Sequence, residues 1–175
     1  MKKTNKAELT ITSCIFVWIL IVNIIAGALG LVSWPMFFVT IFFFTMGADP
    51  KNIPSIFIGG TIGLAFAYLL ALGLDKLTPI IGLYATFLPL ITIVLGVIII
   101  GGTVWPVGFN NIAFAYLTVA AINIFELKLS DILNNLVMLY VGGGIILGGV
   151  VLMNMLGGKL VAKQEAKQKA EEKAE

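Results

Sequence analysis

Long runs of apolar residues, broken at short intervals by charges and prolines, make up most of the chain. They do not alternate with a period of two residues, as the strands of a membrane barrel would. Because a bilayer offers no water to backbone groups, each run is expected to form an α-helix. The pattern predicts an all-α integral membrane protein with six transmembrane helices: Leu9–Leu31, Trp34–Ala48, Pro54–Leu74, Pro79–Gly101, Trp105–Phe125 and Ser130–Gly157.

The second of these segments, Trp34–Ala48, is short. A helix of this length rises about 22 Å, whereas the hydrocarbon core of a bilayer is about 30 Å thick. Two interpretations stay open at this point. The segment is either a short span in a thinned membrane or a re-entrant helix that turns back to the side from which it started.

Two landmarks occur once in each half of the chain. A Trp-Pro pair opens the second and the fifth segments, at Trp34–Pro35 and Trp105–Pro106. A Gly-Gly pair lies in the third and the sixth segments, at Gly59–Gly60 and Gly142–Gly143. The alternative to duplication is chance, since apolar sequences rich in Gly, Ile, Leu and Phe align easily.

The landmarks predict two three-helix repeats, residues 9–74 and 79–157. Three crossings per repeat is an odd number, so the second repeat would be inverted relative to the first. Inverted repeats build many transporters, with the solute site at the repeat interface near the middle of the membrane. A proline in the first turn of a helix loses no hydrogen bond, so Pro35 and Pro106 are predicted to begin helices.

The distribution of charge predicts how the chain is oriented. Of the 175 residues 59% are hydrophobic and 11% are charged, and the net charge is +2. With six crossings, nine of the eleven Lys lie on the side that holds the N-terminal residues 1–8 and the charged tail, residues 158–175. The positive-inside rule then places both termini in the cytoplasm, which fits a multi-pass protein of the bacterial inner membrane. Termini on one side require an even number of crossings, either six or four with two re-entrant segments. This weak basicity is no sign of nucleic-acid binding.

The inventory of reactive side chains argues against catalysis. The chain has no His and a single Cys, Cys14, which lies in the first apolar segment. No metal site, cofactor or enzymatic activity is therefore expected. The four carboxylates between residues 9 and 158 lie near segment ends, so a proton-coupled pump is less favoured than a facilitator: Asp49, Asp75, Glu126 and Asp131.

Polar residues inside the segments are the candidates for a solute path. Asn111 and Thr118 share one face of the fifth segment, and a shift of 71 positions pairs them with Thr40 and Gly47. An amide in hydrocarbon is costly unless it finds a partner, so the Asn residues either join helices or line a watered path. With the Trp residues at the two expected helix starts, the predicted path comprises Asn23, Trp34, Thr40, Gly47, Trp105, Asn110, Asn111 and Thr118.

Small residues recur at every fourth position of the third and sixth segments. Such faces allow close approach of helices, so they are assigned to packing within a protomer or between protomers of a homo-oligomer. The residues concerned are Gly59, Gly63, Ala67, Gly144 and Gly148.

Two resemblances add to this picture. The Leu31–Trp34 stretch after the first segment, the short aromatic segment and the Gly-rich third segment resemble a small family of uncharacterised bacterial inner-membrane proteins of unknown function. The stretch Gly108–Ala113, followed by Tyr116–Leu117, and the Leu88–Leu90 element are locally similar to urea transporters. The second resemblance implies small amides as the solute class, although the chain is about half the length of such a transporter and lacks a Pro before Phe109.

We therefore expect a membrane channel or facilitative transporter for a small uncharged polar solute, such as urea or a short amide. Its partners would be the lipid bilayer, the solute and further copies of the chain. The alternative is a structural or accessory membrane subunit without a solute path, in which the polar residues only join helices.

Overall fold

A computed structural model describes residues 6–172, with side chains for residues 9–159. Within this part the chain is helical and contains no strand. Four apolar stretches are long enough to cross a membrane. They correspond to α1 (Lys6–Ala28), α3 (Ile53–Ile81), α4 (Leu83–Val104), and the combined α6 (Leu129–Val137), η3 (Met138–Gly142) and α7 (Gly143–Glu172). Of the predicted terminal regions, residues 1–5 and 173–175 lie outside the described residues.

Two further helices are short and apolar. They are α2 (Trp34–Thr45) and α5 (Asn111–Ala120), and 3-10 turns follow them at η1 (Pro50–Asn52) and η2 (Ala121–Asn123). A short second helix was expected, but the expectation of a full-length fifth span over 105–125 is wrong. Both halves of the chain contain one helix too short to cross a bilayer at its usual thickness.

The equivalence between the two Trp-Pro pairs is also wrong. Pro35 lies in the first turn of α2, as expected. Trp105 instead ends α4, and α5 begins only at Asn111, after a loop that contains Pro106. The reason is the side chain of Asn110, whose Oδ1 accepts hydrogen bonds from the backbone N–H groups of Ile112 and Ala113 and so fixes the start of α5.

The boundary between the third and fourth segments lies later than expected. The helix α3 continues through Asp75 and Lys76, which are exposed and paired at 3.0 Å, and it contains Pro79 near its end. Gly82, with φ +86°, makes the turn into α4. The chain reverses at Gly82 because glycine readily adopts a positive φ. The helix does not end at Asp75 and Lys76, because charged side chains on an exposed helix face can stay solvated.

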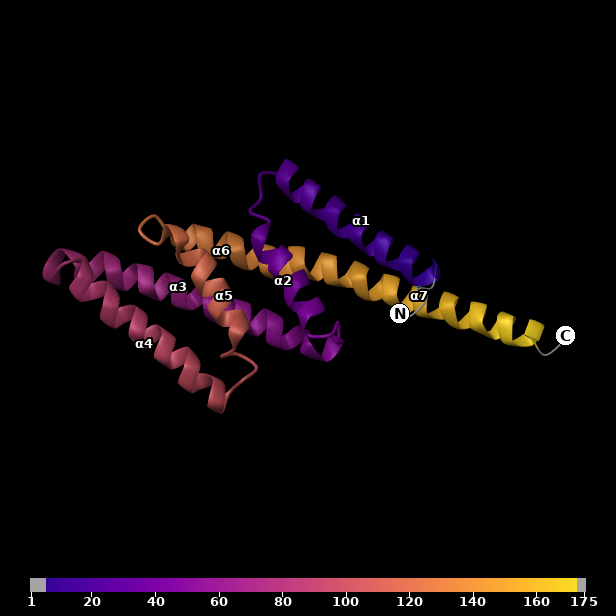
Figure 1. Cartoon of the computed structure of the whole chain (residues 1–175). Coiled ribbons are helices and arrows are strands. Elements are labelled where there is room, and N and C mark those ends of the chain that lie inside the picture. Colours follow the sequence, from indigo (N-terminus) through magenta and orange to yellow (C-terminus); the bar gives the residue numbers. More distant parts are fainter. Residues whose placement is uncertain (1–5, 173–175) are drawn as a thin grey trace.

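Figure 1 shows how the helices are arranged. α1 lies along α7 on one side of the molecule, α4 lies along α3 on the other side, and α2 and α5 cross the middle. α2 packs on α7 and η3, and α5 packs on α3. The first residues of α1 lie beside the middle of α7, where the Ile11 side chain packs on Gly157.

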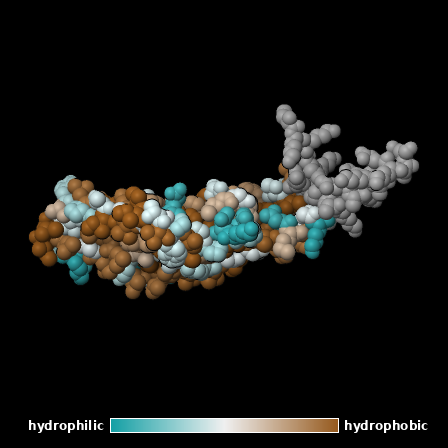
Figure 2. Space-filling view, turned by 90° about the horizontal axis from the view of Figure 1, so that it is seen from below, coloured by the Kyte–Doolittle hydropathy of each residue, from teal (hydrophilic) through white to brown (hydrophobic). Residues whose placement is uncertain are grey.

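Close packing at glycines joins the long helices. The Trp18 ring packs on Gly149, and its Nε1 donates to the carbonyl oxygen of Ile146 at 3.3 Å. On the opposite side the Leu90 side chain packs on Gly73 and joins α4 to α3. Figure 2 shows hydrophobic residues over much of one face, with hydrophilic groups between them, as expected for a surface that meets lipid.

Candidate functional site

A cluster of aromatic rings fills the space between α2 and α5. Trp34, Phe38 and Phe42 follow one another at intervals of four residues and so share one face of α2. Ring centroids lie 5.5 Å apart for Trp34 and Phe38 and 5.9 Å apart for Phe38 and Phe42. Tyr116 of α5 lies 5.4 Å from Trp34 and 5.6 Å from Phe38. We call these four residues the aromatic cluster.

Tyr116 is the fixed member of the aromatic cluster. Its side chain is fully buried. Its hydroxyl donates a hydrogen bond of 2.5 Å to the carbonyl oxygen of Pro35, in the first turn of α2. This bond satisfies the only polar atom that a buried tyrosine brings and joins α5 to α2.

A pocket of about 300 Å³ lies at one end of the aromatic cluster. It is formed where α2 ends and where α3 and α5 begin, and we call it the α3 pocket. Its polar lining consists of hydroxyl and amide groups without a formal charge. The lining residues are Phe42, Thr45, Met46, Ser55, Pro106, Asn110, Asn111 and Ile112.

The two asparagines of the α3 pocket differ in their hydrogen bonding. Asn110 is fully engaged: beyond the cap of α5, its Nδ2 lies 3.0 Å from Ser55 Oγ and also donates to the carbonyl oxygens of Pro106 and Val107. Asn111 is exposed, and its side chain has no hydrogen bond to the described residues. Asn110 therefore holds the loop and the two helix starts together, and Asn111 is the amide that is open to a solute.

A second pocket, of about 270 Å³, lies at the opposite end of the aromatic cluster. It is formed where α5 ends and where α2 and α6 begin, and we call it the α6 pocket. Asn135 in its wall is only 7% exposed, and its amide has no hydrogen bond to the described residues. Buried amides are nearly always hydrogen-bonded, so this one is expected to bind water or a solute in the pocket. The lining residues are Val32, Trp34, Val119, Ala120, Asn123, Glu126, Leu127, Asp131, Asn134 and Asn135.

The α6 pocket also carries two carboxylates. Asp131 accepts a hydrogen bond of 2.9 Å from the backbone N–H of Lys128 and so caps α6. Glu126 is exposed on the loop that precedes α6. Both are at the mouth of the pocket, whereas Asn135 is buried, so the acidic groups are solvated and the deeper wall is neutral.

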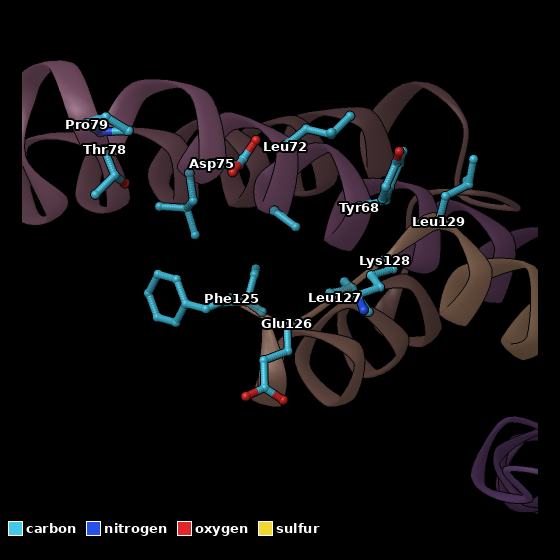
Figure 3. A pocket seen from close by; sticks show the side chains of 13 residues that line it. Tyr68, Leu72, Asp75, Thr78, Pro79, Phe125, Glu126, Leu127, Lys128 and Leu129 are labelled. Atoms are coloured by element: carbon cyan, nitrogen blue, oxygen red, sulfur yellow. The ribbon is translucent and has the colours of Figure 1, made fainter.

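A larger pocket, of about 610 Å³, adjoins the α6 pocket, with which it shares Glu126 and Leu127. Figure 3 shows it between α3, which contributes Tyr68 and Asp75, and the loop at Phe125–Leu129. The Glu126 carboxylate points away from α3 in this view. None of its lining residues belongs to the aromatic cluster, so this pocket is a groove beside the α2 and α5 pair and not a part of it.

Three of the eight predicted path residues line the two pockets. Trp34 is in the wall of the α6 pocket, and Asn110 and Asn111 are in the wall of the α3 pocket. Thr40 and Thr118 instead donate to carbonyl oxygens of their own helices.

The other three predicted path residues lie apart from both pockets. Asn23 is on α1 and donates to the Ile19 carbonyl oxygen at 2.8 Å. Gly47 has φ +81° in the turn after α2. Trp105 packs edge-on against Phe109, with ring centroids 6.0 Å apart.

The small residues expected at helix contacts also divide into two groups. Gly59 lies against Asn110, Gly63 lies against the backbone of α5, and Ala67 is fully buried. Gly144 and Gly148 have open space where a side chain would project, so they make no close approach within the chain. The close approaches near them are instead at Gly142 and Gly143, which pack on side chains of α2, and at Gly149, which packs on the Trp18 ring of α1.

Sequence reasoning missed most of the aromatic cluster and the amides of the α6 pocket. The missed residues are Phe38, Phe42, Tyr116, Asn123, Asn134 and Asn135. Two signals were present: the four-residue spacing of aromatic residues in the second segment, and the doubled amide at 134–135 near the start of the sixth segment. Neither signal identifies a site by itself, because the sequence does not show which helix packs against these residues.

No group of His, Cys, Asp and Glu within the described residues has the arrangement of a metal site. Comparison of the chain with family models, curated proteins and solved structures finds no match. A function for the chain is therefore inferred from the geometry of the two pockets and of the aromatic cluster.

Proposed function

We propose that the chain is a membrane channel or facilitative transporter for a small uncharged polar solute. The observation that carries this proposal is the position of the two polar pockets at opposite ends of the α2 and α5 pair. Trp34 of the α6 pocket and Phe42 of the α3 pocket are eight positions apart on α2, so the pockets approach each other to within about 12 Å. This is shorter than the hydrocarbon thickness of about 30 Å that a solute would otherwise cross.

We also propose that the path lies at the interface of two inverted three-helix repeats. The helix contacts support this: α1 pairs with α7 as α4 pairs with α3, and α2 packs on α7 as α5 packs on α3. The two pockets are related in the same way. The α3 pocket is built from the end of α2 and the starts of α5 and α3, and the α6 pocket from the end of α5 and the starts of α2 and α6. Solute sites at such interfaces are common among transporters.

The solute class follows from the walls. Free amides at Asn111 and Asn135 offer both donors and acceptors, as a short amide or urea would require. Between them the aromatic cluster offers mainly ring surfaces, which cannot replace the hydration shell of an ion. With both termini in the cytoplasm, as the Lys distribution favours, the α3 pocket opens toward the cytoplasm and the α6 pocket toward the other side.

The exposed apolar residues of α1 and α4 are available to lipid or to a second copy of the chain. Each of these helices packs mainly on one neighbour, and α4 exposes large residues along its length, including Ile93, Ile99 and Ile100. This arrangement is compatible with a homo-oligomer in which every protomer contains its own path.

The test is solute flux into reconstituted vesicles, followed by stopped-flow light scattering with urea, acetamide, glycerol, formate and ammonium. Vesicles with the native chain should take up at least one neutral solute faster than empty vesicles. Asn135→Leu should lower that flux, because it removes the buried amide of the α6 pocket. The matched control is Asn154→Leu, since Asn154 is exposed on α7 outside both pockets.

Two results would contradict the proposal. One is the absence of flux above the empty vesicles for every solute, which would favour the accessory subunit. The other is an equal flux for Asn135→Leu and Asn154→Leu, which would remove the α6 pocket from the path.

A further inference from the structure

We propose that Phe38 closes the path between the two pockets and determines which solutes pass, an inference that rests on the proposed function. The aromatic cluster extends without a gap from one pocket to the other. Trp34 lines the α6 pocket, Phe42 lines the α3 pocket, and Phe38 lies one helical turn from each. The stretch of α2 from Trp34 to Phe42 is about 12 Å long, so a solute that crosses it leaves water for only that distance.

The opposite wall has the same order along α5. Ile112 lines the α3 pocket, Tyr116 belongs to the aromatic cluster, and Ala120 lines the α6 pocket. These residues also recur every four positions and so share one face. Two faces, one from each short helix, thus enclose the same passage and place Phe38 against Tyr116 at its middle.

Phe38 is held less firmly than Tyr116, the residue of α5 that it faces. Tyr116 is fully buried and bound to the Pro35 carbonyl oxygen, so its ring is held at both ends. Phe38 is half-buried and meets other rings on its sides. On the other face of α2, Met36 and Val39 are fully buried and pack on the glycines of η3 and α7.

The chemistry of the aromatic cluster selects the solute. Its one hydroxyl, on Tyr116, is fully buried and already donates to Pro35, so between Trp34 and Phe42 a passing solute finds no side chain that is free to donate a hydrogen bond. Each hydrogen bond that the solute gives up raises the barrier, and an ion would give up far more. The ligand class is therefore a compact neutral molecule with few hydrogen-bonding groups.

The test measures access from each side of the membrane rather than flux. On a Cys14→Ser background, Asn111→Cys reports on the α3 pocket and Asn134→Cys on the α6 pocket, and both native side chains are exposed. In sealed vesicles with one orientation, a small hydrophilic thiol reagent should label each cysteine from its own side only.

Phe38→Ala should allow labelling of each cysteine from the far side as well, at a rate raised about tenfold or more. The matched control is Phe37→Ala, because Phe37 is the adjacent residue, is 44% exposed and lies outside the aromatic cluster. Phe37→Ala should leave far-side labelling unchanged. Phe38→Leu, which keeps apolar volume but loses the flat ring, serves where the alanine variant is too unstable to purify.

The outcomes separate the two proposals. Labelling of each cysteine from its own side, with no effect of either Phe38 variant, would overturn the role of Phe38 and leave the two pockets as parts of a path. Failure of either cysteine to react from any side would instead overturn the proposed function together with this inference. A raised far-side rate in Phe38→Ala alone would support both.

Discussion

The two short helices reach the middle of the molecule by different contacts. α2 begins at a proline and packs the side chain of Val39 on Gly143. α5 begins at an asparagine cap and brings its backbone on to α3, where the Ala113 carbonyl oxygen lies over Gly63. One helix thus meets its long partner through a side chain, and the other meets it through the main chain.

This difference indicates that the proposed path has one rigid wall, formed by α5, and one adaptable wall, formed by α2. The atom nearest to an added Cβ at Gly143 is a Val39 methyl group, which can move by a small change of torsion angle, whereas the carbonyl group that lies against Gly63 can shift only with its whole helix. The α5 wall, which holds Tyr116, is therefore the fixed one. The α2 wall, which holds Phe38, is where small movements meet the least resistance.

The largest expected effect is at Gly63. Gly63→Ala would place a methyl group against the Ala113 carbonyl oxygen and within 2.8 Å of the Tyr116 Cβ. We expect a loss of about 3 kcal/mol in the free energy of unfolding. Gly143→Ala should lose less, about 1 kcal/mol, since its nearest neighbour is a Val39 methyl group at 2.8 Å rather than backbone, and alanine favours a helix. Denaturant titration in detergent micelles measures both.

Gly148→Ala is the control for these substitutions, because nothing lies within 4 Å of the added Cβ. It should leave stability unchanged or slightly raised. Equal losses for Gly63→Ala and Gly143→Ala would contradict the division into a rigid and an adaptable wall.

The starts of the two helices should also respond differently to alanine. Asn110→Ala removes the cap of α5 and the bonds that hold Ser55 and the preceding loop. We expect a loss of about 2 kcal/mol in the free energy of unfolding. Ser33→Ala at the start of α2 should cost under about 0.5 kcal/mol, because the Ser33 side chain makes no capping bond. The same titration tests the pair, and similar losses would contradict it.

The long helices could be predicted from the sequence because an apolar run in lipid has no alternative to a helix. The start of α5 could not be predicted in this way, because the side-chain cap at Asn110 decides where the helix begins and the Trp-Pro pair does not. Asn110 fixes the helix start with two hydrogen bonds, and no pattern distinguishes a capping Asn from an Asn that faces a solute. The positive φ of Gly82 likewise decided the α3 boundary over the charges at Asp75 and Lys76.

The candidate site was predictable only where polar residues stand out in an apolar segment. Asn110 and Asn111 are conspicuous in this way, and both line a pocket. Phe38 and Tyr116 are not, because an aromatic residue on an apolar helix faces lipid as readily as it faces a partner. Phe37, the neighbour of Phe38 in sequence, is exposed. Only the packing of α2 against α5 shows that Phe38 contacts a partner helix and that Phe37 does not.

The bond between the two walls should have a smaller effect than the cap. Tyr116→Phe removes the hydroxyl that donates to the Pro35 carbonyl oxygen and leaves the ring in place. We expect a loss of about 1 kcal/mol in the free energy of unfolding. Tyr140→Phe is the matched control: Tyr140 is exposed, and its hydroxyl lies 2.8 Å from Thr61 Oγ1. A larger loss for Tyr140→Phe would mean that the bond between α2 and α5 adds little.

The smallest effect on stability, with a clear effect on transport, is expected at Asn111. Its amide is exposed and makes no hydrogen bond to the described residues, so Asn111→Leu should leave the unfolding midpoint and the oligomer size unchanged. Flux of the carried solute should fall about fivefold, the effect of one lost hydrogen bond in the barrier. Because Asn111 and Asn135 are at opposite ends of the aromatic cluster, the double variant should lower flux by roughly the product of the two single effects. Unchanged flux in Asn111→Leu, for every solute that the native chain carries, would remove the α3 pocket from the path and leave Asn110 with a purely structural role.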